Sequence, residues 1–231
     1  MEPSLPVVEC FHSLQGEGEH AGKSAYFIRL ASCKVGCPWC DTKDSWNSQL
    51  HPKQSLIDLS TQTAKAHKEG AAFVVITGGE PLHHNLDHLC KEIRESTLNQ
   101  ENKSIPIHLE TSGVDMLSGN PDWITLSPKR HYPPRLDNLL SCQELKVIIQ
   151  NTEDLLFAKT MADLIKNNGK IKPKLFLQAG WENEEGQTLA IKFVKNNPDW
   201  RLSMQTHKWL GVLYPSRLMR FCFIRFKKNN D

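Results

Sequence analysis

The 231-residue sequence has no long apolar run, no basic stretch leading into an apolar stretch at its N-terminus, and no excess of charge of either sign. A membrane-spanning helix needs about 18 consecutive apolar residues, and a secretion signal needs that N-terminal pattern. The 28 Lys and Arg residues are balanced by 26 Asp and Glu residues, so composition predicts neither a nucleic-acid surface nor an acidic partner. We therefore expect a cytoplasmic protein that binds neither membranes nor nucleic acid.

Internal repeats, low-complexity tracts and long linkers are also missing, so the chain is expected to form one large domain around one core. The number of cysteines, seven, is odd. Three of the cysteines lie within residues 33–40. This distribution favours a reduced compartment and a metal site over a disulfide framework.

Short apolar stretches alternate with polar, helix-periodic stretches along the chain. Strands are predicted at 25–32, 72–77, 105–111, 123–128, 144–150, 174–179 and 201–206. Helices are predicted at 55–70, 86–98, 153–167 and 187–196. This alternation is typical of a mostly parallel sheet covered by helices. Because about 200 residues is short for eight complete β/α units, we predict an α/β fold with a partial, open β/α barrel.

Polar or glycine-bearing segments follow the predicted strands at their carboxyl ends. They are 32–41, 77–81, 110–113, 127–129, 178 and 205–207. Parallel sheets bind ligands at this end of their strands. The segments are therefore expected to meet at one rim and to form one pocket there.

The segment Cys33-Lys-Val-Gly-Cys37-Pro-Trp-Cys40 follows a predicted strand directly. Its three thiolates could hold three irons of a 4Fe-4S cluster, which normally takes four cysteine ligands, so one iron would stay open. A zinc site completed by a histidine such as His51, or a set of reduced, buried thiols, is the alternative. Zinc sites of this size usually pair two C-x2-C units, and this segment has one.

The cysteine pattern and the glycine-rich segment Thr-Gly-Gly-Glu-Pro at 77–81 together resemble the radical S-adenosylmethionine superfamily. In that superfamily, the open iron binds S-adenosylmethionine, and one electron from the reduced cluster releases a 5′-deoxyadenosyl radical. The resemblance therefore implies two cofactors: a 4Fe-4S cluster held by Cys33, Cys37 and Cys40, and S-adenosylmethionine.

From about residue 7 to residue 213, the chain is similar to the 7-carboxy-7-deazaguanine synthase family. The segments that carry this resemblance are 11–19, 27–30, 39–42, 77–81, 110–113, 126–129 and 201–208. That family converts 6-carboxy-5,6,7,8-tetrahydropterin to 7-carboxy-7-deazaguanine with loss of ammonia, on the route to queuosine and related deazapurines. The resemblance implies a lyase that forms a homodimer, needs Mg²⁺ and takes electrons from a single-electron donor such as a flavodoxin.

The family's substrate contacts match Leu14, Gln15, Gly16, Arg29, Thr77 and Leu213 of this chain. The planar guanidinium of Arg29 suits a pterin carboxylate, although a surface ion pair is the alternative for a lone arginine. Glu17 lies between two glycines, where the backbone can approach a ligand closely. It is the candidate catalytic residue, holding the substrate ring or moving a proton, and a solvated turn is its alternative.

The cofactor contacts implied by the resemblance are Trp39, Cys40, Asp41, Gly79, Ser112, Ser127, Pro128, Lys129 and Gln178. Isolated polar residues at strand ends, such as Ser112 and Gln178, are often plain loop residues. Thr42 matches a family Mg²⁺ ligand, although on sequence alone its hydroxyl is a local cap. A single hydroxyl requires substrate oxygens and waters to complete an octahedron. His207 is either a titrating group beside the substrate or a packing histidine.

The chain departs from the family at its C-terminal end. Family members end near the position of Leu213, whereas this chain continues with an aromatic and basic segment, 214–231. We expect a domain of residues 1–213 and an extension of residues 214–231 that adds a helix or strand on the surface, the alternative being a tail that binds nucleic acid or an acidic partner. The continuation weakens the assignment of Leu213, because no chain-terminal carboxylate is available there.

Two other functions are compatible with the cysteine pattern. One is an activase of the same superfamily that abstracts hydrogen from a glycine of a partner protein. The other is a non-catalytic Fe-S or zinc binding module. The segment 14–18 and Arg29 favour a small carboxylated ring over a protein loop as the substrate.

Overall fold

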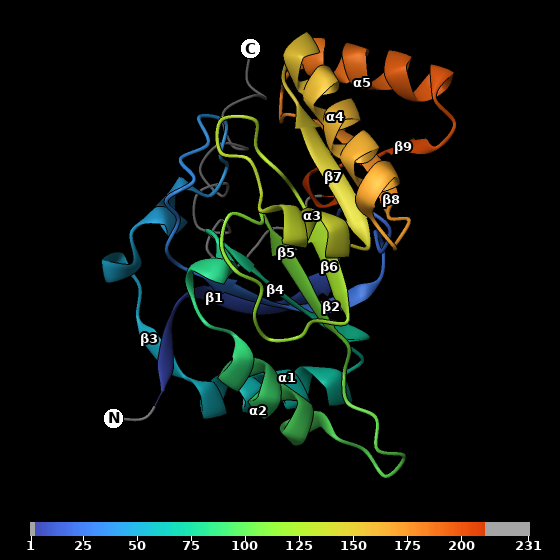
Figure 1. The fold of residues 1–231 in the computed structure, drawn as a ribbon. Coiled ribbons are helices and arrows are strands. Elements are labelled where there is room, and N and C mark those ends of the chain that lie inside the picture. Colours follow the sequence, from blue (N-terminus) through green and yellow to red (C-terminus); the bar gives the residue numbers. More distant parts are fainter. Residues whose placement is uncertain (1–2, 211–231) are drawn as a thin grey trace, which may run out of the picture.

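The structure is a computed structural model that describes residues 3–210, and within them the chain folds around a nine-stranded sheet (Figure 1). The strand order is β3-β1-β2-β4-β5-β6-β7-β8-β9. From β2 through β9 the neighbouring strands run parallel, while β1 pairs antiparallel with both β2 and β3. Because β3 and β9 are both edges, the predicted α/β fold with an open, partial barrel and a mostly parallel sheet is confirmed.

The strands are β1 (Ser4–Leu14), β2 (Ser24–Leu30), β3 (Lys53–Ser55), β4 (Phe73–Gly78), β5 (Ile107–Thr111), β6 (Trp123–Leu126), β7 (Glu144–Ile149), β8 (Lys174–Ala179) and β9 (Trp200–Leu202). The α-helices are α1 (Leu56–Lys68), α2 (Asp87–Thr97), α3 (Leu136–Ser141), α4 (Thr152–Asn168), α5 (Glu184–Asn196) and α6 (Thr206–Trp209). The 3-10 helices are η1 (Lys43–Trp46), η2 (Ser48–Leu50) and η3 (Pro81–His83).

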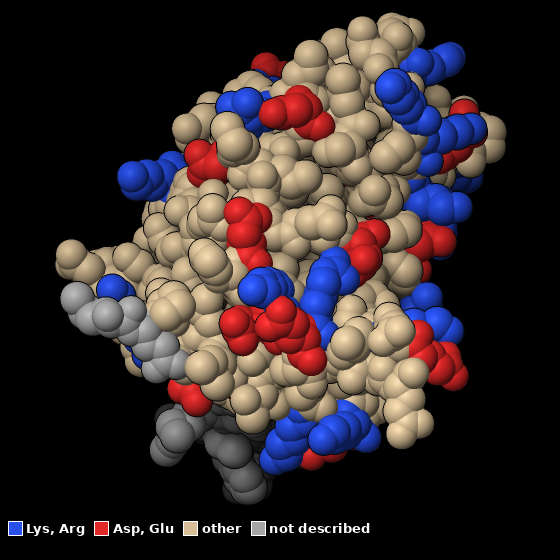
Figure 2. Space-filling model, turned by 60° about the horizontal axis from the view of Figure 1, so that its bottom comes forward, with Lys and Arg blue, Asp and Glu red and all other residues tan. Residues whose placement is uncertain are grey.

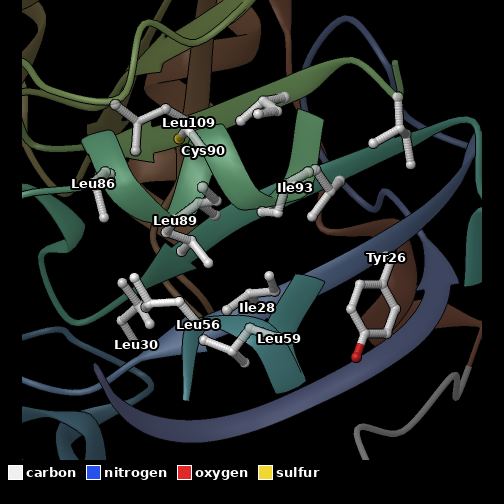
Figure 3. Close-up of a cluster of buried hydrophobic side chains, with 14 of the residues drawn as sticks. Tyr26, Ile28, Leu30, Leu56, Leu59, Leu86, Leu89, Cys90, Ile93 and Leu109 are labelled. Carbon is white, nitrogen blue, oxygen red and sulfur yellow. The ribbon is translucent and has the colours of Figure 1, made fainter. Parts of the chain in front are cut away.

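The helices α1 to α5 pack on the outer face of the sheet in two groups (Figure 1). α1 and α2 cover β1, β2, β4 and β5 in a core where Ile28, Leu59 and Leu89 have no exposed surface (Figure 3). α3, α4 and α5 cover β6 to β9 in a second core that contains Val147 and Leu177. Removing this apolar surface from water is the main force that holds the layers together.

The inner face of the sheet is apolar at one end and polar at the other. Phe27 and Phe73 pack together on it near the start of the barrel. Because successive strand residues point to opposite faces, polar side chains between apolar ones also turn inward. The buried polar residues of these strands include Thr77, Thr125, Glu144, Lys146 and Gln178. The barrel interior therefore carries polar and charged side chains toward the carboxyl ends of the strands.

The loop 15–23, between β1 and β2, fills the floor of the barrel. The main-chain N–H of Gly18 donates to Ser203 Oγ (3.1 Å), and that of Glu19 donates to Glu144 Oε2 (3.0 Å). The His20 ring lies 4.7 Å from the His108 ring, between centroids. Burial lowers the pKa of His108 to about 3, so this ring contact is uncharged at neutral pH. The loop thus joins the first hairpin to β7 and to the residues after β9.

Most of the predicted strands and helices are confirmed within a few residues. The strand predicted at 201–206 is present as β9, but it is shorter than predicted, because β9 ends at Leu202 and α6 begins at Thr206. Among the strands and α-helices, β1, β3, α3 and α6 were not predicted, nor were the three 3-10 helices. β1 carries mixed polar and apolar residues because it pairs close to the sheet edge, where one face is partly exposed.

None of the helices within residues 3–210 has the length and apolar character that crossing a membrane requires. Leu213 and the extension 214–231 lie outside the described residues. The division of the chain at residue 213 stays a prediction.

Leu89→Ala is expected to lower the free energy of unfolding by about 2–5 kcal/mol, because it leaves a cavity between α2 and its neighbours. Leu89 has 0% exposed surface. Leu98, at the end of α2, is 56% exposed, so Leu98→Ala should change stability by no more than about 0.5 kcal/mol. Urea unfolding followed by circular dichroism measures both, and equal losses would contradict the assigned core.

Candidate active site

A cavity of about 220 Å³ opens at the carboxyl ends of the parallel strands, where the sequence predicts a rim. Segments that follow β2, β4, β5, β6 and β8 line it, together with β7 and the loop 15–23. The predicted site residues that line the cavity are Glu17, Cys33, Cys37, Trp39, Cys40, Asp41, Thr77, Gly79, Ser112, Ser127, Lys129 and Gln178. Those that do not are Leu14, Gln15, Gly16, Arg29, Thr42 and Pro128, while Leu213 lies outside the described residues.

A second cavity, of about 640 Å³, lies at the opposite end of the sheet, between α4, β8 and β9. Its lysines, Lys166, Lys170 and Lys172, are exposed. The smaller cavity is the better candidate for chemistry, because it gathers buried ionisable groups from several strands.

The three cysteines lie on one loop after β2, and all three face the smaller cavity. The N–H of Cys33 donates to the main-chain oxygen of Trp46 (3.2 Å), which ties this loop to η1. Burial raises the pKa of the Cys33 and Cys37 thiols, and the charge of Lys129 opposes this for Cys37. Three free thiols on one loop fit the donor set of a 4Fe-4S cluster with one open iron.

The described residues also test the alternative of a zinc site at the three cysteines. Within residues 3–210, no three His, Cys, Asp or Glu side chains are arranged to hold a single metal ion. His51, the histidine considered as a fourth zinc ligand, has its Nε2 2.8 Å from the main-chain oxygen of Asp44. The structure gives His51 a role in holding the loop around η1 and η2.

The glycine-rich segment after β4 packs directly against the cysteine loop. The N–H of Glu80 donates to the oxygen of Ser32 (2.8 Å). A Cβ at Gly79 would lie 2.4 Å from that same oxygen, so only glycine fits. Ser32 has a φ of 97°, which is rare for a residue with a side chain and costs about 1–3 kcal/mol. This strained turn brings the cysteine loop and Gly79 to the same wall of the cavity.

Glu80 is 1% exposed and organises the segment after β5 beside the cysteine loop. Its carboxylate accepts hydrogen bonds from Thr111 Oγ1 (2.5 Å), Ser112 N (2.7 Å) and Ser112 Oγ (2.5 Å). The carboxylate also accepts from the N–H of Leu82 (3.1 Å). Ser112 is therefore fixed by Glu80, and its hydroxyl oxygen keeps its acceptor capacity on the cavity side.

The predicted cofactor residues after β6 form a compact unit. Lys129 Nζ donates to the main-chain oxygen of Ser127 (2.8 Å) and to its hydroxyl (2.7 Å). Burial lowers the pKa of Lys129, while the neighbouring Cys37 opposes that shift. Trp39 meets the ring of His131 edge-on at 5.5 Å, and His131 Nε2 lies 3.0 Å from the oxygen of Val35. These contacts connect the residues after β6 with the cysteine loop.

Glu110, on β5, is held at both carboxylate oxygens. Gln15 Nε2 donates to Oε1 and Thr77 Oγ1 donates to Oε2, each at 2.9 Å. Gln15 is buried behind Glu110 and does not line the cavity, whereas Thr77 and Glu110 do. The predicted substrate residues Gln15 and Thr77 thus converge on a carboxylate that the sequence analysis had not assigned.

Glu17 is held in the same way on the other side of the cavity. Lys146 Nζ donates to its Oε2, and Gln205 Nε2 donates to its Oε1 (2.8 Å). Burial alone would raise the pKa of Glu17, but the charge and hydrogen bond of Lys146 lower it to about 2. Burial opposes the charge on Lys146, and Glu17, Glu110 and Glu144 outweigh it and raise the pKa of Lys146. Both groups are ionised at neutral pH.

Gly16 lies beneath His207. A Cβ at Gly16 would lie 2.1 Å from His207 Nδ1, so a side chain there would displace the imidazole. The Gly16 oxygen accepts from the N–H and the hydroxyl of Thr206, each at 3.0 Å. Burial lowers the pKa of His207, and Glu17 opposes that shift. α6 is therefore anchored on the loop 15–23.

The remaining predicted residues lie outside the cavity wall or at its margin. Arg29 Nε donates to Glu9 Oε1 (3.0 Å), and both side chains are 11% exposed, so this pair is largely buried rather than a surface pair. Thr42 Oγ1 lies 3.6 Å from Cys40 Sγ. Gln178 Oε1 accepts from Ser203 Oγ (2.7 Å), and Leu14 is 41% exposed.

The predicted rim segments contain Glu80, Glu110 and Gln205 without a role for any of them, and Lys146 and Lys208 were not predicted at the site. A signal existed for two of them, because Glu110 and Lys146 interrupt otherwise apolar strands at alternate positions. A charge at such a position of a buried strand needs a partner or a ligand. The pattern was interpreted as a continuous apolar strand, which hid the inward-facing charges.

Residues 28–129 match the Radical SAM superfamily, which defines the class of the protein. The 7-carboxy-7-deazaguanine synthase of Prochlorococcus marinus is 56% identical over 92% of this chain and 100% of its own length. That of Synechocystis sp. is 46% identical over 90% of this chain and 94% of its own. The crystal structure of QueE from Escherichia coli matches with a TM-score of 0.72 and 29% identity, over 87% of this chain and 93% of that one. The chain belongs to the 7-carboxy-7-deazaguanine synthase family, and the predicted resemblance is confirmed.

Membership of the Radical SAM superfamily implies a 4Fe-4S cluster and S-adenosylmethionine as cofactors. The residues present fit both groups. Cys33, Cys37 and Cys40 provide three thiols on one side of the cavity, and Gly79 leaves room for close approach of a ligand beside them.

The ion pair of Glu17 predicts a specific pH dependence of stability. The pKa of Glu17 falls from its ordinary value of 4.5 to about 2 in the folded protein. Its ionised form therefore favours folding fully above pH 4.5, and this contribution is lost as the pH falls through about 2. The difference in free energy of unfolding between the wild type and Glu17→Gln should shrink over that window.

Urea unfolding at a series of fixed pH values measures this difference. Glu69→Gln is the matched control, because Glu69 pairs with Lys65 on the surface and is 53% exposed. The control difference should stay small at every pH. A Glu17→Gln difference that does not change with pH would contradict the assigned ion pair.

Proposed function

We propose that the protein converts 6-carboxy-5,6,7,8-tetrahydropterin to 7-carboxy-7-deazaguanine with loss of ammonia. The observation that carries the proposal is one cavity with two chemically different walls. One wall presents the three thiols and Gly79, and the other presents Glu17, Glu110 and Lys146. The named relatives support this function, and they do not support the activase or the non-catalytic metal-binding module.

When bound, the cluster and S-adenosylmethionine supply the one-electron chemistry that removes a hydrogen atom from the substrate. The chain itself binds and orients the two molecules and limits water. Trp39, Cys40, Asp41, Gly79, Ser112, Ser127, Pro128, Lys129 and Gln178 are proposed to contact S-adenosylmethionine. Holding both reactants in one narrow cavity turns a bimolecular step into an intramolecular one.

The substrate wall suits a ring that is rich in N–H donors. Glu17 and Glu110 are each held at both oxygens by protein donors, which leaves further lone pairs directed at the cavity. We assign Leu14, Gln15, Gly16, Thr77 and Leu213 to substrate binding with them, and Glu17 as the catalytic residue. Because Glu17 is ionised, it is prepared to accept hydrogen bonds from N–H groups of the substrate.

Arg29 is assigned to the substrate carboxylate. Its Nε is bound by Glu9, so Glu9 sets the plane of the guanidinium. A guanidinium fork binds a carboxylate through two parallel N–H groups, which an ammonium cannot reproduce.

Several further features belong to this proposal. Thr42 would ligate Mg²⁺ through its hydroxyl, with substrate oxygens and waters as the other ligands. The protein would act as a cytoplasmic homodimer, with a single-electron donor such as a flavodoxin. On the face shown in Figure 2, basic and acidic side chains are interspersed, which agrees with a small-molecule substrate rather than nucleic acid. Residues 1–213 would be the catalytic domain and 214–231 its extension.

An anaerobic product assay tests the function. Reconstituted protein with dithionite, S-adenosylmethionine and Mg²⁺ is expected to convert 6-carboxytetrahydropterin to 7-carboxy-7-deazaguanine, identified by mass spectrometry. Formation of 5′-deoxyadenosine without this product would retain the superfamily and exclude the substrate. Zinc at one per chain, with no iron or sulfide after anaerobic purification, would exclude the enzyme altogether.

Arg29→Lys should raise the KM for the pterin by about 10-fold to 100-fold, because the bidentate contact is lost while one charge remains. The absorption spectrum of the cluster should be unchanged. Arg135→Lys is the control, since Arg135 pairs with Asp137 and is 45% exposed, and its KM should equal that of the wild type. Loss of the cluster in Arg29→Lys would show that Arg29 has a structural role instead.

A further inference from the structure

A continuous chain of polar contacts crosses the cavity from the substrate wall to the cysteine loop. It begins at Lys146, whose Nζ donates to Glu17 Oε2. Gln205 Nε2 donates to Glu17 Oε1 (2.8 Å), and Gln205 Oε1 accepts from Lys208 Nζ (3.0 Å). Lys208 Nζ also donates to Asp41 Oδ2 (2.7 Å). Asp41 directly follows the last cysteine of the loop, so the chain joins both walls.

Lys208 is held far more tightly than a surface lysine. Its side chain is only 10% exposed, although Asp41 is 42% exposed. Its Nζ also lies 4.4 Å from the centre of the Trp181 ring, which lines the cavity. An ammonium removed from water needs such partners, because burial without them is costly. Lys208 therefore connects α6, the cysteine loop and the segment after β8.

The orientation of Gln205 follows from its two neighbours. The amide N–H must face the carboxylate of Glu17, and the amide oxygen must face the ammonium of Lys208. A reversed amide would bring donor to donor and acceptor to acceptor. Each link thus requires the next one, and a displacement of Glu17 is passed to Lys208.

The backbone that carries Gln205 and Lys208 is held in place by hydrogen bonds to the loop 15–23. Thr206, at the start of α6, binds the oxygen of Gly16 through both its N–H and its hydroxyl, each at 3.0 Å. Gln205 and Lys208 lie on either side of Thr206 in sequence and extend from the same anchor. The side chains that cross the cavity can therefore respond to a ligand while the backbone below them stays in place.

We propose that Gln205 and Lys208 are positioning residues that couple binding of the pterin to binding of S-adenosylmethionine. The inference rests on the proposed function, which places the pterin at Glu17 and S-adenosylmethionine beside Asp41. A substrate N–H that binds Glu17 strengthens the Gln205 orientation, which holds Lys208 on Asp41. The same coupling acts in reverse, because linkage between two binding sites is reciprocal.

Binding without turnover tests the coupling directly. The dissociation constant of S-adenosylmethionine is measured by isothermal calorimetry on reconstituted, oxidised protein, with and without 6-carboxytetrahydropterin. In the wild type, the pterin should tighten S-adenosylmethionine at least about 5-fold. Lys208→Met and Gln205→Leu should each reduce that factor to near one. The double variant should behave like either single variant, since all three break the same chain.

Two further variants separate coupling from general damage. Lys208→Arg keeps a charged donor and should retain most of the coupling. Lys172→Met removes a lysine that pairs with Asp199 at the other end of β8, and it should leave the coupling unchanged. Circular dichroism and the cluster absorption spectrum identify any variant that does not fold.

Turnover provides a second measurement. With dithionite present, Lys208→Met should release more 5′-deoxyadenosine per deazapurine formed than the wild type does, because cofactor cleavage is no longer tied to substrate binding. Wild-type coupling in Lys208→Met and Gln205→Leu, with an unchanged product ratio, would overturn the inference while leaving the proposed function intact. Absence of any deazapurine from the wild type would instead overturn the function.

Discussion

The ion pair between Glu17 and Lys146 allows the interior of this open barrel to carry charge. A buried ammonium and a buried carboxylate are each unfavourable alone, and together they offset the loss of water. Glu17 comes from the loop between the first two strands, and Lys146 comes from β7. Their contact therefore also fixes where that loop lies inside the barrel. The position of Gly16 under His207 and the anchoring of α6 follow from that placement.

The organisation around this pair divides the cavity into two halves with different requirements. The half at the cysteines is built mainly from backbone, with Ser32 strained and Gly79 packed against it. The half at Glu17 and Glu110 is built mainly from side chains that hydrogen-bond to one another. Backbone fixes the position of a large inorganic group well, while side-chain networks can adapt to an organic ring.

Local pattern was enough to predict most of the architecture. The apolar stretch of β4, the capped periodicity of α1 and the alternation of the two elements each depend on nearby residues, so they can be read from sequence. β1 was missed because its polar residues face a partner, as Glu9 does with Arg29, and not because strand character is absent. The strand predicted at 201–206 is shorter than predicted, because the chain leaves β9 after Leu202 and α6 starts on a tertiary contact between Thr206 and Gly16.

The same distinction applies to the site. The spacing of their residues predicts the cysteine loop and the glycine-rich segment. The glycines at 16 and 18 likewise indicate the loop that carries Glu17. Glu110, Lys146 and Lys208 have no such spacing. Their roles depend on which residues lie opposite them across the barrel, and sequence separations of 95, 129 and 167 residues conceal those partners.

These separations also bear on the order in which the molecule is assembled. Many of the hydrogen bonds that hold the cysteine loop come from residues 32–46 and from the segment after β4, early in the chain, while His131 and Lys208 add later ones. The loop 15–23 is completed only by contacts with Gln205 and Thr206. These residues lie 188 and 190 positions after their partners Glu17 and Gly16. Chains emerge from the ribosome N-terminus first, and distant contacts close late. The floor of the cavity therefore closes only after almost all of the described chain has been synthesised, whereas much of the support for the thiol ligands is present earlier.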